Sequence, residues 1–400
     1  MIALKHRFNL LILLTLSSLF IGTVFADNSV DTMPELRNAG LLVLKHTAPP
    51  ISKNENNHFT PASTTKLITA WLVLQNWGED HHFTTDFFFD KTTHTLSIKG
   101  SGDPYLVSEE LHLIAKNLKQ LGLSRIDTII LDHSIFQNSL SVPGASQTSN
   151  PYDAIPSALA ANFNTLNIVR NSTGIASAEK QTPITSTAHK IAQEYAVSNN
   201  AMRINTGFSV HDAERYFAEL MIHFLRQQQI QVKQNILWAT APNTPPYYRH
   251  SNRKSLGEVV QIMLKYSNNF IANQLMLMVT TEFYHYPANF SDVQRYMHFY
   301  LQNYFGWQDF TLKEGAGLSR DNRLSPAQLV LLLNEFKQWK HLLPNIAKGI
   351  YAKSGTLRSV STLAGYYIDN EQHWNAFSLM MKQSVHHPRR IQIIRQLVAK

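Results

Sequence analysis

The sequence contains no cysteine, and this absence excludes disulfide bonds, thiol catalysis and thiolate metal sites. A chain of 400 residues without cysteine depends on its hydrophobic core for stability, and its length suggests two domains more readily than one. Internal repeats and low-complexity tracts are also absent. The formal net charge is +8, but the basic residues form no dense stripe, so a nucleic-acid partner is not expected.

Long apolar runs are lacking everywhere except at the N-terminus. Lys5 and Arg7 precede an apolar run over residues 10–24, and small residues around Ala26 form a cleavage site. We therefore predict a signal peptide over residues 1–26 and an exported protein of the periplasm or cell envelope. An uncleaved membrane anchor is the alternative. The mature chain would have a net charge of about +6 and at most peripheral membrane contact.

A serine and a lysine three residues apart, Ser63 and Lys66, stand at the start of an apolar-periodic segment that ends near Gly78. Side chains at this spacing share one helix face, so the lysine amine could activate the serine hydroxyl. Backbone N–H groups at a helix N-terminus also suit a developing oxyanion. The alternative is that Ser63 is an ordinary helix N-cap. Ser-x-x-Lys occurs twice more, at Ser177 and Ser251, but without this context.

The periodicity predicts an α/β fold. Strands are expected at residues 39–45, 84–89, 95–98, 127–131, 349–354, 357–368 and 374–382. Helices are expected at residues 109–121, 188–196, 212–228, 255–266, 270–282 and 388–400, and after Ser291 and Ser325. Residues 138–183 are polar, and prolines at 242–246 mark a boundary. We predict one catalytic domain from residues 27–82 and 246–400, with residues 83–245 as one or more inserted domains.

Two further motifs carry polar groups that suit acyl transfer. Ser267-Asn268-Asn269 lies between two predicted helices, where a hydroxyl could relay a proton and an amide could hold a peptide. Lys353-Ser354-Gly355-Thr356 ends a predicted strand and offers a cation, hydroxyls, a glycine that permits close approach, and a backbone N–H for an oxyanion.

The order of these three motifs is the signature of penicillin-binding proteins and serine β-lactamases. The chain resembles the class C low-molecular-mass penicillin-binding proteins, the D-alanyl-D-alanine carboxypeptidases and endopeptidases with a large insertion between the first two motifs. Ser63 and Ser267 are 204 residues apart, too far for a class A β-lactamase. Further stretches that resemble this group are residues 100–104, 155–159, 314–320, 357 and 363–365.

The resemblance implies a transpeptidase-like fold, an antiparallel sheet with helices, and a serine DD-peptidase that acts on peptidoglycan stem peptides, is inhibited by β-lactams and needs no cofactor or metal. Ser63 would be the acylated nucleophile, Lys66 its base, Ser267 the proton relay to the leaving amine and Asn269 a peptide ligand. Lys353 would attract the substrate carboxylate with help from Ser354 and Thr356, and the N–H groups of Ser63 and Thr356 beside Gly355 would bind the oxyanion. Arg320 and Arg358 are candidate stem-peptide contacts.

Some residues depart from the pattern of this group. Asn268 stands where aspartate is common, Ser354 replaces threonine, and Glu314 begins a segment that usually reads Asp-Gly-Ser-Gly. The insertion is also shorter than usual, so one inserted subdomain could be reduced. A β-lactamase is the competing enzyme, although the second motif is Ser267-Asn268-Asn269 and not Tyr-x-Asn, and no deacylating glutamate is placed as in class A enzymes. A catalytically silent scaffold protein is the alternative from another class.

Three features have a simpler explanation that we prefer. The histidine pairs at residues 81–82 and 386–387 lack further ligands at metal-binding spacing. The C-terminal helix has an apolar side around Ile394, with Arg390 expected away from it, and packing on the sheet is favoured over membrane contact. Asp153 is read as a turn residue, with a substrate amine as its alternative partner.

Overall fold

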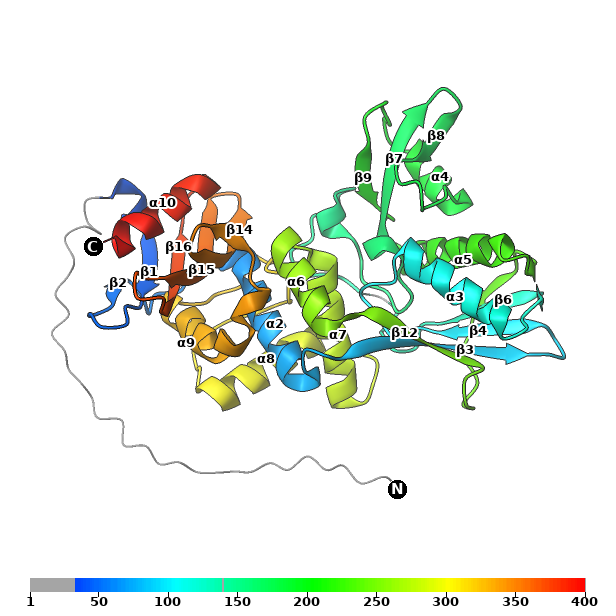
Figure 1. The fold of residues 1–400 in the computed structure, drawn as a ribbon, viewed down its shortest axis with the longest axis horizontal. Coiled ribbons are helices and arrows are strands. Elements are labelled where there is room, and N and C mark those ends of the chain that lie inside the picture. The colour runs from blue at the N-terminus through cyan, green and yellow to red at the C-terminus, as the bar shows by residue number, and fades with distance from the viewer. Residues whose placement is uncertain (1–32, 139, 400) are drawn as a thin grey trace, which may run out of the picture.

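The computed structural model describes residues 33–138 and 140–399. The predicted signal peptide over residues 1–26 lies outside them. Figure 1 shows two lobes joined through a group of helices that includes α6 and α7. Over the described ranges, no helix is long and apolar enough to cross a membrane.

One lobe is built on a six-stranded antiparallel sheet with the strand order β13-β14-β15-β16-β1-β2. Its strands are β1 (Ala39–Val43), β2 (Ile51–Lys53), β13 (Asn345–Ala347), β14 (Ile350–Leu357), β15 (Val360–Ile368) and β16 (Trp374–Met381). The helix α10 (His387–Val398) packs against this sheet, because Ile391, Ile394 and Leu397 share a buried core with strand residues. The predicted strands and the packing of the C-terminal helix on the sheet are therefore confirmed.

A helical layer covers the opposite side of that sheet (Figure 1). Its members are η2 (Ala62–Thr65), α2 (Lys66–Trp77), α6 (Leu256–Tyr266), α7 (Asn269–Tyr284), α8 (Phe290–Phe305), α9 (Pro326–Phe336) and η5 (Lys337–Leu342). The helices α6 and α9 begin after Ser255 and Ser325, as predicted, and each of these residues forms a capping box. The predicted cap of α8 at Ser291 is wrong, because Asn289 and Asp292 form that box.

The other lobe contains a five-stranded mixed sheet with the strand order β11-β6-β4-β3-β12. Its strands are β3 (His82–Asp90), β4 (Thr95–Lys99), β6 (Thr128–Asp132), β11 (Ile236–Trp238) and β12 (Tyr248–Ser255). The helices α3 (Ser108–Gln120) and α5 (Val210–Gln227) share a buried core with these strands, and the short strands β5 (Arg125–Ile126) and β10 (Gln231–Val232) pair beside them. Because β12 pairs with β3, the sheet continues to Ser255; the boundary at residue 245 stays a prediction.

A small antiparallel sheet stands apart from the larger one in the same lobe (Figure 1). It consists of β7 (Thr165–Asn171), β8 (Gly174–Ser177) and β9 (Met202–Asn205), next to α4 (Ser186–Gln193). The polar residues 138–183 showed no strand pattern in the sequence. The strands were not predicted because they bury few side chains, so hydrophobic alternation along them is weak.

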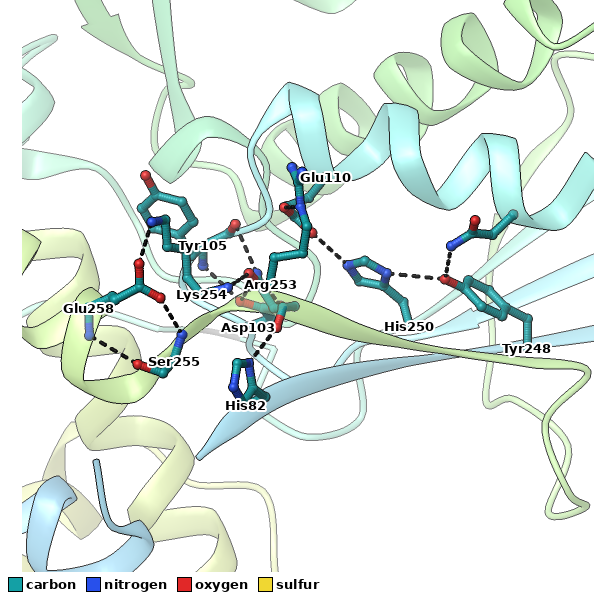
Figure 2. A network of polar contacts seen from close by, with 12 residues as sticks. His82, Asp103, Tyr105, Glu110, Tyr248, His250, Arg253, Lys254, Ser255 and Glu258 are labelled. Carbon is teal, nitrogen blue, oxygen red and sulfur yellow. Dashed lines mark hydrogen bonds and ion pairs between the residues drawn. The ribbon is translucent and has the colours of Figure 1, made fainter. Parts of the chain in front are cut away.

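A largely buried network of polar groups ties α3 and the preceding loop to β12 (Figure 2). Both carboxylate oxygens of Asp103 accept from the Asn252 amide, at 3.1 and 2.9 Å. Glu110 contacts His250 at 3.0 Å and Arg253 at 2.6 Å. Since β12 leads directly into α6, this network attaches the second lobe to the helices of the first.

Candidate active site

Ser63 lies within η2, the helical turn that leads into α2. The side-chain nitrogen of Lys66, Nζ, is 3.1 Å from Ser63 Oγ. The alternative role of Ser63 as a helix N-cap is wrong, because Pro61 and Thr65 hold the cap positions of η2 and α2. The other two Ser-x-x-Lys serines lie on strands, Ser177 on β8 and Ser251 on β12. Only Ser63 therefore combines this spacing with a helix start in the structure's described part.

Lys66 is fully buried beneath the serine. Its Nζ also lies 2.7 Å from Asn269 Oδ1 and 2.7 Å from the carbonyl oxygen of Ala316. Burial lowers the pKa of Lys66 well below its usual value, the charge of Lys353 lowers it further, and Glu314 opposes the shift. The side chain is thus held in place by two acceptors and can be neutral when it faces Ser63.

The carbonyl of Ala316 is positioned by a buried carboxylate in the same loop. Glu314 accepts hydrogen bonds from the backbone N–H groups of residues 316–319 and from the Asn322 amide. Such a closed set of donors fixes the loop conformation, since each buried partner would otherwise be unsatisfied. In the sequence, Glu314 stands out only as a departure from the pattern of the family, and its position before Gly-Ala-Gly is the available signal of its role.

The second motif bends the chain between α6 and α7. Ser267 ends α6 in the left-handed region, with φ of 55°, and Asn268 caps α7 by accepting from the N–H of Ile271 at 3.0 Å. The departure at Asn268 therefore has a structural role. Asn269 begins α7 and bridges two parts of the site, because it accepts from Lys66 and donates to the carbonyl of Tyr152 at 3.2 Å.

The third motif lies on β14, whose outer edge pairs with β13 only up to Tyr351. The N–H of Ala352 donates outward to Pro344, at 3.2 Å. Because N–H directions alternate along a strand, the N–H groups of Ser354 and Thr356 face this same edge. A Cβ on Gly355 would come 2.8 Å from the backbone nitrogen of Ser63, so the glycine permits β14 and η2 to approach closely.

Two buried cations support this strand. Lys353 Nζ donates to the carbonyl of Ser354 at 2.7 Å, and burial, helped by the charge of Arg390, lowers the pKa of Lys353 to about 8. The guanidinium of Arg390 donates to the carbonyl of Gly355 and to Thr356 Oγ1, both at 2.8 Å. The expectation that Arg390 lies away from the apolar side of α10 is wrong. Its spacing from Ile394, four residues, was the missed signal.

Residues of all three motifs line one cleft with a volume of about 440 Å³. They are Ser63, Ser267, Asn269, Ser354 and Thr356. Another wall comes from the inserted region, including Tyr152 and Asp153. Asp153 accepts from the backbone N–H groups of Ser146 and Thr148, which supports its interpretation as a turn residue.

The two arginines predicted to contact substrate lie side by side at the surface. The guanidinium of Arg320 donates to the carbonyl of Arg358 at 2.9 Å, and both residues are exposed. Neither belongs to the residues that line the cleft. Within the ranges that the structure describes, no cluster of three or more His, Cys, Asp or Glu residues could hold a metal ion.

Comparisons with known proteins agree on one family. A model of the D-Ala-D-Ala carboxypeptidase 3 (S13) family matches residues 26–348, a range that ends before the third motif. The D-alanyl-D-alanine carboxypeptidase DacB of Haemophilus influenzae is 24% identical over 423 residues, covering 86% of this chain and 85% of its own. The penicillin-sensitive carboxypeptidase A of Dictyostelium discoideum is 23% identical over 422 residues, covering 83% and 80%.

The crystal structure of penicillin binding protein 4 from Haemophilus influenzae has a similar fold. It superposes with a TM-score of 0.72 at 20% identity, covering 87% of this chain and 91% of the other. The likeness confirms the predicted fold class, a mixed α/β architecture of the penicillin-binding type.

Proposed function

Because the chain belongs to the D-Ala-D-Ala carboxypeptidase 3 (S13) family, we propose that Ser63 is the nucleophile of a D-Ala-D-Ala carboxypeptidase that acts through an acyl-enzyme. The protein is a hydrolase of this family, with carboxypeptidase or endopeptidase activity on peptidoglycan stem peptides. The observation that carries the proposal is the buried Lys66 amine, 3.1 Å from Ser63 Oγ. A neutral amine at this distance can accept the proton of the hydroxyl.

In the proposed first step, Ser63 Oγ attacks the carbonyl carbon of the penultimate D-alanine while its proton moves to Lys66. The N–H groups of Ser63 and Thr356 bind the oxyanion that forms, which stabilises the transition state. The C–N bond then breaks, and Ser267 passes a proton to the leaving amine. Water finally hydrolyses the acyl-enzyme and releases the shortened peptide.

The remaining polar groups bind the substrate in this proposal. Asn269 holds the peptide amide on the acyl side. Lys353 attracts the terminal carboxylate, with Ser354 as a hydroxyl partner, and its lowered pKa of about 8 leaves it mostly charged at neutral pH. Arg320 and Arg358 lie beside the cleft as contacts for more distant parts of the stem peptide.

The partners and location follow from the family and remain proposals for this chain. Relatives are named for D-alanyl-D-alanine hydrolysis and for sensitivity to penicillin. We therefore propose β-lactams as inhibitors, and peptidoglycan in the periplasm or cell envelope as the substrate. The predicted signal peptide over residues 1–26 supports export.

Intact-protein mass spectrometry with benzylpenicillin tests the proposal. The mature protein should gain the mass of one intact benzylpenicillin, and peptide mapping should place it on Ser63. Ser63→Ala should remain unmodified. Ser177→Ala, which changes the serine of another Ser-x-x-Lys, should be acylated like the wild type. Drug loss without an adduct would indicate a β-lactamase, and no reaction of any kind would indicate a silent scaffold.

A further inference from the structure

A second cavity, of about 530 Å³, adjoins the active-site cleft. Four residues line both, namely Tyr152, Tyr266, Ser267 and Asn269. The two spaces therefore adjoin at these four residues. The volume of the second cavity is in the range of small-ligand sites, far more than a single alanine would need.

The walls of the second cavity are largely aromatic. Tyr105, Phe163 and Phe270 line it together with Tyr152 and Tyr266. Tyr152 and Tyr266 are 60% and 66% exposed, so they do not belong to the hydrophobic core. Tyr105 is next to the polar network between the two lobes (Figure 2). Exposed aromatic rings gathered at a cavity are typical of surfaces that bind a ligand.

A cation stands in the wall of this aromatic cavity. Arg203 lies on β9, and its guanidinium donates to Thr165 Oγ1 at 2.9 Å and pairs with Glu179. The side chain is 37% exposed. A guanidinium has five N–H donors in a planar fork, so it can hold these partners and also bind a carboxylate of the ligand.

Ser267 and Asn269 both line the two spaces, and in this inference Ser267 orients the substrate, while entry of the acyl-donor peptide beside Asn269 is the competing outcome. In the proposed mechanism this serine protonates the leaving amine, and it lines both spaces. A group attached to that amine would therefore extend from the cleft into the second cavity. In carboxypeptidase action the group is one D-alanine, whereas in a cross-linked substrate it is a whole stem peptide that carries carboxylates.

We infer that the second cavity is the binding site for the leaving stem peptide of cross-linked peptidoglycan. Arg203 binds a carboxylate of that peptide, and the aromatic rings pack against its aliphatic parts. This inference rests on the proposed function and extends it by assigning a place where the leaving peptide of the endopeptidase reaction binds.

Steady-state kinetics of the mature protein on two substrates tests the inference. One is a monomeric pentapeptide ending in D-Ala-D-Ala, and the other is a D-alanyl cross-linked muropeptide dimer. Arg203→Ala should reduce kcat/KM for the dimer about tenfold, the effect of losing a hydrogen bond to a charged group. Ile262→Trp, which narrows the second cavity, should also reduce it. Both variants should cleave the pentapeptide within about twofold of the wild-type rate.

Glu179→Gln is the matched control for Arg203, since it removes the ion-pair partner but keeps the guanidinium. It should cleave the dimer like the wild type, whereas a purely structural role of Arg203 would make both variants equally poor. Equal losses on both substrates would place the acyl-donor peptide in the cavity and overturn the inference, as would unchanged dimer cleavage in both Arg203→Ala and Ile262→Trp. Failure of the proposed function is recognised separately, because the wild type would then cleave neither substrate.

Discussion

Three basic side chains are buried close together at the centre of the site. Lys66, Lys353 and Arg390 are 0%, 3% and 3% exposed. Burial disfavours the charged form of each, and the charges of Lys353 and Arg390 disfavour protonation of their neighbours. The site therefore separates two roles: Lys66, fully buried against Ser63 with a strongly lowered pKa, suits a base, while Lys353, with a pKa of about 8, is mostly charged at neutral pH and suits an anion site.

At acid pH, the rate of acylation should depend on the protonation of Lys66. A base must be neutral, so the rate of benzylpenicillin acylation should rise with pH through a pKa well below the usual lysine value. Lys66→Ala should slow acylation by about 10² to 10⁴-fold and abolish this rise. Stopped-flow or quench-flow acylation between pH 5 and pH 10 measures both effects. Lys180→Ala, from another Ser-x-x-Lys, should match the wild type; normal acylation of Lys66→Ala would exclude it as the base.

Arg390 should affect the fall of activity at alkaline pH, because it influences the pKa of Lys353. If the substrate requires protonated Lys353, activity falls above about pH 8. Arg390→Gln removes a positive charge that lowers the pKa of Lys353, so this fall should move to higher pH. Arg390→Lys keeps a charge but loses the planar fork, so it should slow acylation about tenfold without moving the pH limit.

The control for this prediction is Arg389→Gln, the neighbouring arginine that pairs instead with Glu35. Its pH profile for pentapeptide hydrolysis should equal that of the wild type. An unchanged alkaline limit in Arg390→Gln would show that Arg390 supports only the fold of β14.

At the scale of elements, the site depends on close backbone contacts between segments that are distant in sequence. Gly355 of β14 approaches Ser63, and Gly317 of the loop after Glu314 approaches Ala62. At Gly317 φ is 83°, and a Cβ would lie 1.9 Å from the carbonyl oxygen of Ala62. The two contacts hold η2 between β14 and the loop that carries the Ala316 carbonyl.

Gly317→Ala should therefore damage both stability and acylation. We expect a loss of about 3 kcal/mol in the free energy of unfolding, from backbone strain and the collision, and at least tenfold slower acylation. Gly122→Ala is the matched control, because Gly122 has φ of 92° but nothing within 4 Å of the added Cβ. It should lose only about 1 kcal/mol and keep the wild-type acylation rate. Equal losses in the two variants would mean that the contact with Ala62 is unimportant.

At the scale of the whole molecule, the polar network in Figure 2 connects the inserted region to the helices of the site. Its most unusual member is Asp103, which is buried and accepts from Asn252 and from the N–H of Tyr105. Burial raises the pKa of Asp103 to about 6, despite these hydrogen bonds. The folded protein therefore binds this proton more tightly than the unfolded chain does.

Stability should consequently depend on pH through Asp103. Between about pH 4 and pH 6 the folded state holds more protons than the unfolded state, so this residue makes the protein less stable as pH rises. The contribution is about 3 kcal/mol across the window and constant above it. Urea unfolding of the wild type and Asp103→Asn at several pH values measures it, because the wild type should lose stability relative to the variant over this window. Parallel stability curves would exclude the effect.

The sequence alone determined the nature of the chemistry and much of the architecture. Apolar periodicity and capping residues are local, so the strands over residues 349–382, the helices α6, α7 and α10, and the motifs around Ser63, Ser267 and Lys353 could be predicted. Their order along the chain then indicated the family. Local signals were insufficient in three places. They left an N-cap role open for Ser63, they put the cap of α8 at Ser291, and they did not indicate the strands within residues 165–205.

Only the tertiary structure decided which groups meet. The burial that lowers the pKa of Lys66, the loop that Glu314 holds and the guanidinium of Arg390 under β14 depend on packing between segments up to hundreds of residues apart. The same holds for the second cavity, whose walls come from both lobes. Desolvation and hydrogen-bond partners are properties of the assembled surroundings of a residue, and local sequence patterns carry no information about them.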